Sequence, residues 1–257
     1  MRSFMSHLRF GQRLLQAVVL ALPLAAALGG CSPQLSAPNS NEIPLEQKEK
    51  KPAPDGWAKI VESVEKSRQI SKFGISGTLE TREQNRFHRS SVYGHVILPD
   101  QAEMSQSVDG RSYYIFQDKT SAYYREEGVW RPISRLQLPD PWDSLQKLAK
   151  IQPPRVDRLE DMTFLKLNDT EVYQFEADAI DVAGLPVSQG KKMPSRYTIY
   201  IDKDTRFIRQ IQILSTSEVD DIGTVVTTAT IKFFDQNNKD VQISMPASLK
   251  EQLKKRE

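Results

Sequence analysis

The stretch AEMSQSVDGRSYYIFQ, residues 102–117, decides the fold of this chain. Asp109-Gly110 is a dipeptide that favours a tight turn, and it separates two runs that are rich in strand-forming residues. We therefore predict a hairpin of two antiparallel strands, 102–108 and 111–117. Similar runs lie on both sides of it, at 73–81, 86–98, 120–126 and 129–133, so the first half of the chain is predicted to be an antiparallel meander.

The second half repeats this pattern. Strands are expected at 156–160, 163–167, 171–177, 196–201, 206–217, 223–235 and 241–244, with turns such as 202–205 between them. Neither of the two helical stretches stands between parallel strands. The fold class is therefore α+β, with one highly curved antiparallel sheet of about ten or eleven strands and helices on one face.

Two stretches carry an apolar stripe at helical spacing. In residues 57–71 the stripe includes Trp57, Ile60 and Val64. The second stretch begins at Asp140-Pro141, a good N-cap followed by proline, and it ends before Pro153-Pro154. Its stripe includes Trp142, Leu145 and Leu148. We expect both helices to cover the concave side of the sheet.

Residues 1–30 are typical of an export signal. Arg2, Arg9 and Arg13 precede an apolar run at 14–28 that is shorter than the roughly 20 residues of a membrane-spanning helix. Leu28-Gly29-Gly30-Cys31 resembles a bacterial lipobox, which implies cleavage before Cys31 and a diacylglycerol on its thiol. The alternatives are an ordinary cleaved signal and an uncleaved anchor. Cys31 is the only cysteine, so the chain has no internal disulfide.

Residues 31–54 are expected to be a lipidated cysteine followed by a flexible tether, because they are polar, proline-containing and without periodicity. Residues 55–257 form the predicted folded domain. The expected location is the extracytoplasmic side of the cell membrane, and Ser32 after the cysteine permits an outer membrane where there are two.

Charge and motifs limit the function classes. The chain has 35 basic and 33 acidic residues, and three of the basic ones belong to the leader, so the remainder is nearly neutral and no nucleic-acid partner is expected. No catalytic, cofactor or metal motif is present, and we predict a protein that is not an enzyme. His88 and His95 are seven residues apart on one strand, hence on opposite faces. Asp202-Lys203-Asp204 resembles the start of a calcium loop but lacks its glycine and distal glutamate.

The order of these features resembles the lipoprotein-carrier (LolA/LolB-like, LppX-like) superfamily and its lipid-anchored relatives. The resemblance covers residues 57–246, and its stretches are Leu98-Pro99, Asp109-Gly110 with Tyr113-Tyr114, Gly128-Val129-Trp130, and the run from Tyr197 to Asp202. It implies an unclosed β-barrel around a hydrophobic cavity, with helices plugging the open side. It does not imply lipoprotein transport itself, which depends on partner proteins.

A set of apolar side chains is predicted to line a hydrophobic-ligand site, or else to form a solid core: Trp57, Ile60, Val64, Trp142, Leu145, Leu148, Phe207, Ile211, Ile213, Val225 and Ile231. Clustered aromatic residues line the same pocket or form cross-strand pairs: Tyr113, Tyr114, Tyr123, Tyr124 and Trp130. Lys191 and Lys192 lie in a loop, where they meet anionic head groups or only solvent.

The leading hypothesis is a lipid-anchored envelope protein that binds a lipid or acyl chain in the half-barrel. The alternative is a structural or regulatory surface lipoprotein without a ligand, acting through an envelope protein partner, for example in sporulation or germination. An exported hydrolase is the least favoured alternative.

Overall fold

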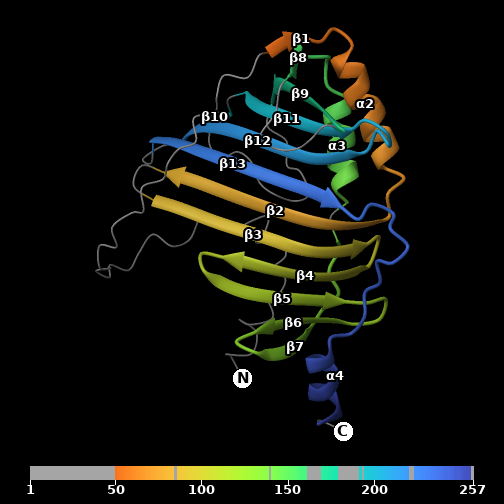
Figure 1. Cartoon of the computed structure of the whole chain (residues 1–257). Coiled ribbons are helices and arrows are strands. Elements are labelled where there is room, and N and C mark those ends of the chain that lie inside the picture. The colour runs from red at the N-terminus through yellow and green to blue at the C-terminus, as the bar shows by residue number, and fades with distance from the viewer. Residues whose placement is uncertain are drawn as a thin grey trace.

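One antiparallel sheet dominates the computed structural model, which describes residues 50–83, 86–138, 140–160, 169–178, 191–192, 194–219 and 223–255. The sheet has thirteen strands in the order β1-β8-β9-β11-β12-β13-β2-β3-β4-β5-β6-β7, and β10 attaches to β12 outside this path. Its two ends do not pair with each other, so the sheet is a curved, unclosed barrel (Figure 1).

The strands have the following bounds. They are β1 Lys50–Pro52, β2 Lys72–Glu83, β3 Arg86–Ile97, β4 Gln101–Val108, β5 Arg111–Gln117, β6 Ala122–Glu126, β7 Val129–Ile133, β8 Val156–Leu159, β9 Thr170–Ala177, β10 Lys191–Lys192, β11 Ser195–Asp202, β12 Ile208–Val219 and β13 Gly223–Phe234. The helices are α2 Gly56–Ser67, α3 Pro141–Ala149 and α4 Ala247–Lys254.

The predicted hairpin is confirmed. Val108 pairs with Arg111, and the turn residues Asp109 and Gly110 have φ angles of 46° and 84°. Gly94 marks a second constraint, because a Cβ added there would lie 2.1 Å from the Glu103 carbonyl oxygen. The backbones of β3 and β4 therefore approach each other too closely for any side chain at position 94.

The helices lie on different faces of the sheet. Met104 packs with the cluster under α2 and α3, and its partner across the strands is Ile115. Phe116 is the next residue, so it points to the opposite face, and there it packs with Leu249 of α4. Thus α2 and α3 cover the concave face near one end of the strand order, and α4 lies on the convex face at the other end (Figure 1).

Several details differ from the sequence predictions. The sheet has thirteen strands where about ten or eleven were expected, and two of them, β1 and β10, are short strands without alternation that match none of the predicted stretches. Residues 50–54, predicted as tether, belong to the folded part, since Ala53 is buried and β1 pairs with β8. Residues 241–244 are not a strand, and α4 was not predicted. The predicted strand 163–167, the leader, Cys31 and most of the tether lie outside the described residues.

Candidate functional site

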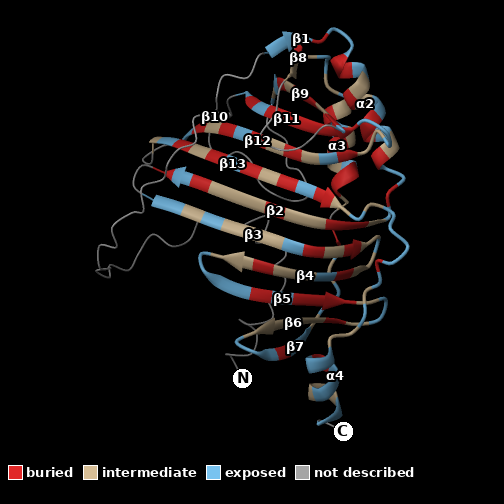
Figure 2. Cartoon of the chain, in the orientation of Figure 1, coloured by how far each residue is buried: buried red, intermediate tan, exposed pale blue. Residues whose placement is uncertain are grey.

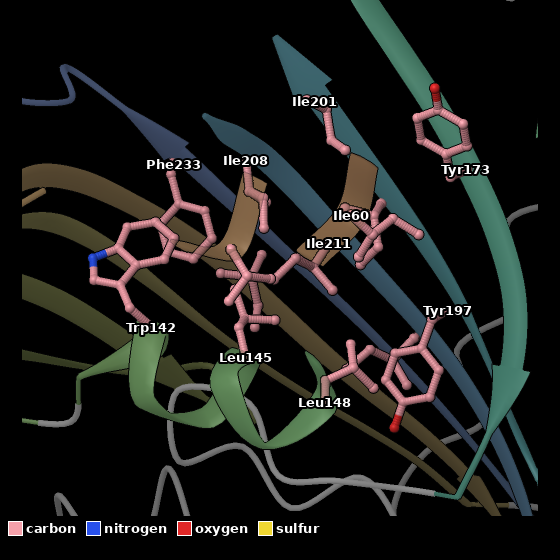
Figure 3. Close-up of a cluster of buried hydrophobic side chains, with 14 of the residues drawn as sticks. Ile60, Trp142, Leu145, Leu148, Tyr173, Tyr197, Ile201, Ile208, Ile211 and Phe233 are labelled. Carbon is pink, nitrogen blue, oxygen red and sulfur yellow. The ribbon is translucent and has the colours of Figure 1, made fainter. Parts of the chain in front are cut away.

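The candidate site is the apolar layer between α2, α3 and the concave face of the sheet. All the predicted lining residues except Val225 belong to one hydrophobic cluster there, and Phe207 is only partly buried in it. Figure 3 shows Trp142, Leu145 and Leu148 pointing from α3 toward the sheet. The fold therefore brings together side chains that were predicted to share a site, while their role in holding a ligand stays a prediction.

Local interactions fix α3 in this position. The Asp140 carboxylate accepts a hydrogen bond from the backbone N–H of Trp142 at 2.8 Å and caps the helix, as predicted. Burial raises the pKa of Asp140, although this same hydrogen bond works in the opposite direction. The Trp142 indole Nε1 donates to the Ile70 carbonyl oxygen at 3.1 Å, and its ring lies 4.6 Å from that of Phe233. This tryptophan thus connects α3 to β13 and to the segment that links α2 with β2.

Aromatic contacts and a hydroxyl fix α2. The ring of Trp57 meets Phe175 edge to face at 5.2 Å, and Phe175 stacks on Tyr197 at 5.2 Å. Ser67 accepts a hydrogen bond from the Ile208 backbone N–H at 3.0 Å, close to the register shift between β11 and β12. α2 therefore satisfies a backbone donor that the irregular strand pairing leaves free.

A charged group lies beside the apolar layer at β9. Glu171 accepts hydrogen bonds from Arg206 at 2.7 Å and from the Tyr173 hydroxyl at 3.0 Å, and its side chain is 14% exposed. Burial alone would raise the pKa of Glu171, but the Arg206 and Tyr173 hydrogen bonds outweigh it and hold the pKa below its usual value. The charge of Glu171 is thus neutralised locally and makes no free anionic site.

The concave face changes from apolar to polar side chains along the length of the strands. On β12 the inward alternation of Ile211 and Ile213 continues into Ser215 and Ser217, which are also buried. Val225 lies at this end, paired with Ser217 and Glu83. Val225 therefore shares the face of the other lining residues but lies outside the helix-covered cluster, and its part in a ligand site stays a prediction.

The cluster also contains residues that were not predicted to line the site. The largest are Phe73, Tyr173, Phe175, Tyr197 and Phe233. Alternation along their strands could have assigned them to one face, but only the pairing of β9 with β11 and of β13 with β2 shows that this face is the helix-covered one.

The predicted aromatic set is divided between the two faces. Tyr113 and Tyr124 lie on the concave face, the same face as Ile115, which pairs with Tyr124. Tyr114 and Tyr123 point to the convex side. Tyr114 is 48% exposed, and Trp130 is buried against α4. These residues therefore do not form one pocket wall.

The remaining sequence candidates do not come together. His88 and His95 lie on opposite faces of β3, as predicted, and contact different carboxylates, Asp109 at 3.4 Å and Asp235 at 3.2 Å. Asp202 accepts hydrogen bonds from the backbone N–H groups of Asp204 and Thr205, as in a hairpin turn. Among the described residues, no group of His, Cys, Asp and Glu could hold a metal ion.

Lys191 and Lys192 form β10, which pairs with Glu218 and Ser217 of β12. The positions of the lysine side chains lie outside what the structure describes, so their predicted contact with anionic head groups stays a prediction. Most of the loop that precedes them lies outside the described residues as well.

Comparison with known proteins identifies a solved structure with a similar fold. No family model and no curated protein matches the chain. Among solved structures, LprF from Mycobacterium bovis aligns with a TM-score of 0.50 and 12% identity over 77% of this chain and 99% of its own. The LolA superfamily protein NE2245 from Nitrosomonas europaea aligns over 72% of this chain and 96% of its own, at 12% identity, with a TM-score of 0.26 that is too low to bear on the fold. The unclosed sheet, its helices and the similarity to LprF together show that the chain has a LolA/LppX-like fold.

Proposed function

We propose that this protein is an extracytoplasmic, lipid-anchored protein that binds the acyl part of a lipid between α3 and the concave sheet. The observation that supports this is the continuous apolar layer, which spans both helices and the concave positions of β8, β9, β11, β12, β13, β2, β3 and β4. When this layer removes acyl surface from water, the free energy of binding would gain about 25 cal/mol per Å2 of buried area, before the entropic cost of binding is subtracted.

The route for a ligand follows from the way α3 is held. Leu145 and Leu148 are completely buried against the sheet, so an acyl chain enters by replacing their contacts with its own. In such an exchange the concave sheet keeps an apolar partner, first the leucines and then the acyl chain, while α3 moves away from the sheet. Pro141 at one end and Pro153-Pro154 beyond the other end keep the helix short, so that it moves as one unit.

A second candidate function is supported by the same burial. Val64, Leu145 and Ile211 are 0% exposed, which is what a solid core also requires. In that case the protein is a structural or regulatory lipoprotein that acts through an envelope protein partner, with no ligand. We propose no catalytic role for either candidate.

Lipid extraction followed by mass spectrometry of the purified full chain separates the two candidates. A carrier brings a lipid in stoichiometric amount, beyond the acyl groups on its own cysteine, and binds a fluorescent fatty acid. Leu145→Ser should weaken probe binding, whereas Leu214→Ser, on the exposed convex side of β12, should not. A ligand-free preparation that binds no probe would contradict the carrier proposal and favour the protein-partner alternative.

The anchor is a separate part of the proposal. It rests on Leu28-Gly29-Gly30-Cys31 and on the nearly neutral remainder of the chain, which gives charge no part in membrane attachment. Within the described residues, none of the helices has the length and apolar character needed to cross a bilayer. Cys31→Ala should move the protein out of the membrane fraction, and unchanged membrane association of this variant would refute lipidation at Cys31.

A further inference from the structure

The edge of the sheet at β7 is covered by the side chain of a glutamine. Gln252 of α4 accepts a hydrogen bond from the Trp130 backbone N–H at 2.9 Å, and its amide nitrogen donates to the Trp130 carbonyl oxygen at 2.6 Å. A carboxamide has the donor and acceptor of a peptide group, so Gln252 occupies the place of a neighbouring strand. The Trp130 indole also donates to the Ser248 hydroxyl at 3.0 Å.

On their convex face, strands β5–β7 pack their apolar side chains against this helix. Among the described residues, none from these three strands belongs to the large cluster under α2 and α3. Their own small cluster lies on the convex face and consists of Phe116, Trp130 and Leu249, with Tyr123, Ile243, Met245 and Leu253 around them. Removing α4 would therefore expose the convex apolar surface of these strands, whereas Tyr113, Ile115 and Ala122 are buried on the opposite face.

The segment that leads to α4 runs past the strand ends from the middle of the sheet to its β7 edge. The strand order places β2, β3, β4, β5 and β6 between β13, where the segment starts, and β7, where α4 docks. Figure 1 shows residues 235–246 running past the ends of these strands. Asn237 fixes the beginning of the segment, since its N–H donates to the Lys72 carbonyl oxygen and its side chain accepts from the Ser71 N–H.

We propose that α4 is a releasable latch that holds β5–β7 and thereby sets how far the half-barrel opens at its β7 edge. The helix has only eight residues, and Leu249 is its one buried residue among those described. A helix this short is marginal without tertiary contacts, so undocking and unwinding occur together. On release, the Trp130 peptide groups become free and the three strands can move away from the helix-covered half of the sheet.

Hydrogen exchange of the full chain tests the latch. Gln252→Ala and Leu249→Ala should raise amide exchange at Trp130 and in residues 111–133 by about fivefold or more, because each removes a docking contact. Exchange in β11, β12 and β13 should stay as in the unmodified protein. The matched control is Glu251→Ala, an exposed residue of the same helix that should leave both regions unchanged. Unchanged exchange at 111–133 in both latch variants, or a uniform rise that includes β11–β13, would overturn the latch.

A second measurement links the latch to ligand exchange, a step that rests on the proposed function. The dissociation rate of a fluorescent fatty acid should rise several-fold in Gln252→Ala and stay unchanged in Glu251→Ala. If the unmodified protein binds no probe, the carrier function fails while hydrogen exchange still decides the latch. If the probe binds and its dissociation rate is the same in Gln252→Ala, the β7 edge is not the route by which ligand leaves.

Discussion

Truncating Leu145 tests whether the layer under α3 is a solid core. Leu145 is 0% exposed and lies in the main cluster between α3 and the sheet (Figure 3). Leu145→Ala removes buried methyl groups and leaves a cavity, which costs about 2.7–5 kcal/mol of the free energy of unfolding. For a domain of this size, that loss lowers the melting temperature by roughly 5–20 °C. Urea unfolding followed by tryptophan fluorescence measures the difference, with Trp142 as a reporter in the same layer.

The matched control is Leu214→Ala on the convex face, where the side chain is 37% exposed and the expected loss is below about 1 kcal/mol. A loss below about 1 kcal/mol for Leu145→Ala would refute the packing described above. Repeating the unfolding with a saturating fatty acid then tests the carrier proposal. A ligand at 100 times its Kd stabilises the folded state by about 2.7 kcal/mol, whereas a solid core gains nothing.

Three further predictions concern individual side chains. Asp140→Ala should cost about 1 kcal/mol of the free energy of unfolding, since the cap of α3 is lost; an unchanged urea midpoint would contradict the capping role. Gly94→Ala should destabilise by at least about 2 kcal/mol, because its Cβ would lie 2.1 Å from a backbone oxygen. Gly77→Ala should cost less, because its Cβ would lie 3.0 Å from the Val92 side chain and 3.7 Å from the nearest backbone atom; equal midpoints would refute the close approach of β3 and β4. The lowered pKa of Glu171 means that its stabilising effect is present above the unfolded pKa, near 4.3, and is lost as the pH falls through the lower folded pKa. Glu171→Gln should therefore flatten the acid limb of stability against pH, and an unaltered limb would show that the Arg206 contact contributes nothing.

The sequence could predict the elements that carry a clear buried stripe, such as α2 and α3, whereas α4 is mostly exposed (Figure 2). The turn at Asp109-Gly110 and the apolar stripes of α2 and α3 depend only on residues close together in the sequence, and all three are confirmed. β1 and α4 could not be predicted, because they are short and polar and exist only through partners distant in the sequence. β1 pairs with β8, and α4 is held by Trp130, more than a hundred residues away.

Val225 shows why alternation alone could not delimit the candidate site. Every second residue of a strand shares a face, so Val225 and Ile231 are equivalent by sequence. Ile231 lies under the helices, whereas Val225 lies six residues further back, among buried polar side chains such as Ser217 and Thr227. The limit of the apolar layer is set by how far α2 and α3 extend along the strands. The concave face is therefore divided into an apolar half and a polar half, and on the proposed function an acyl chain lies along α3 rather than along the full length of the strands.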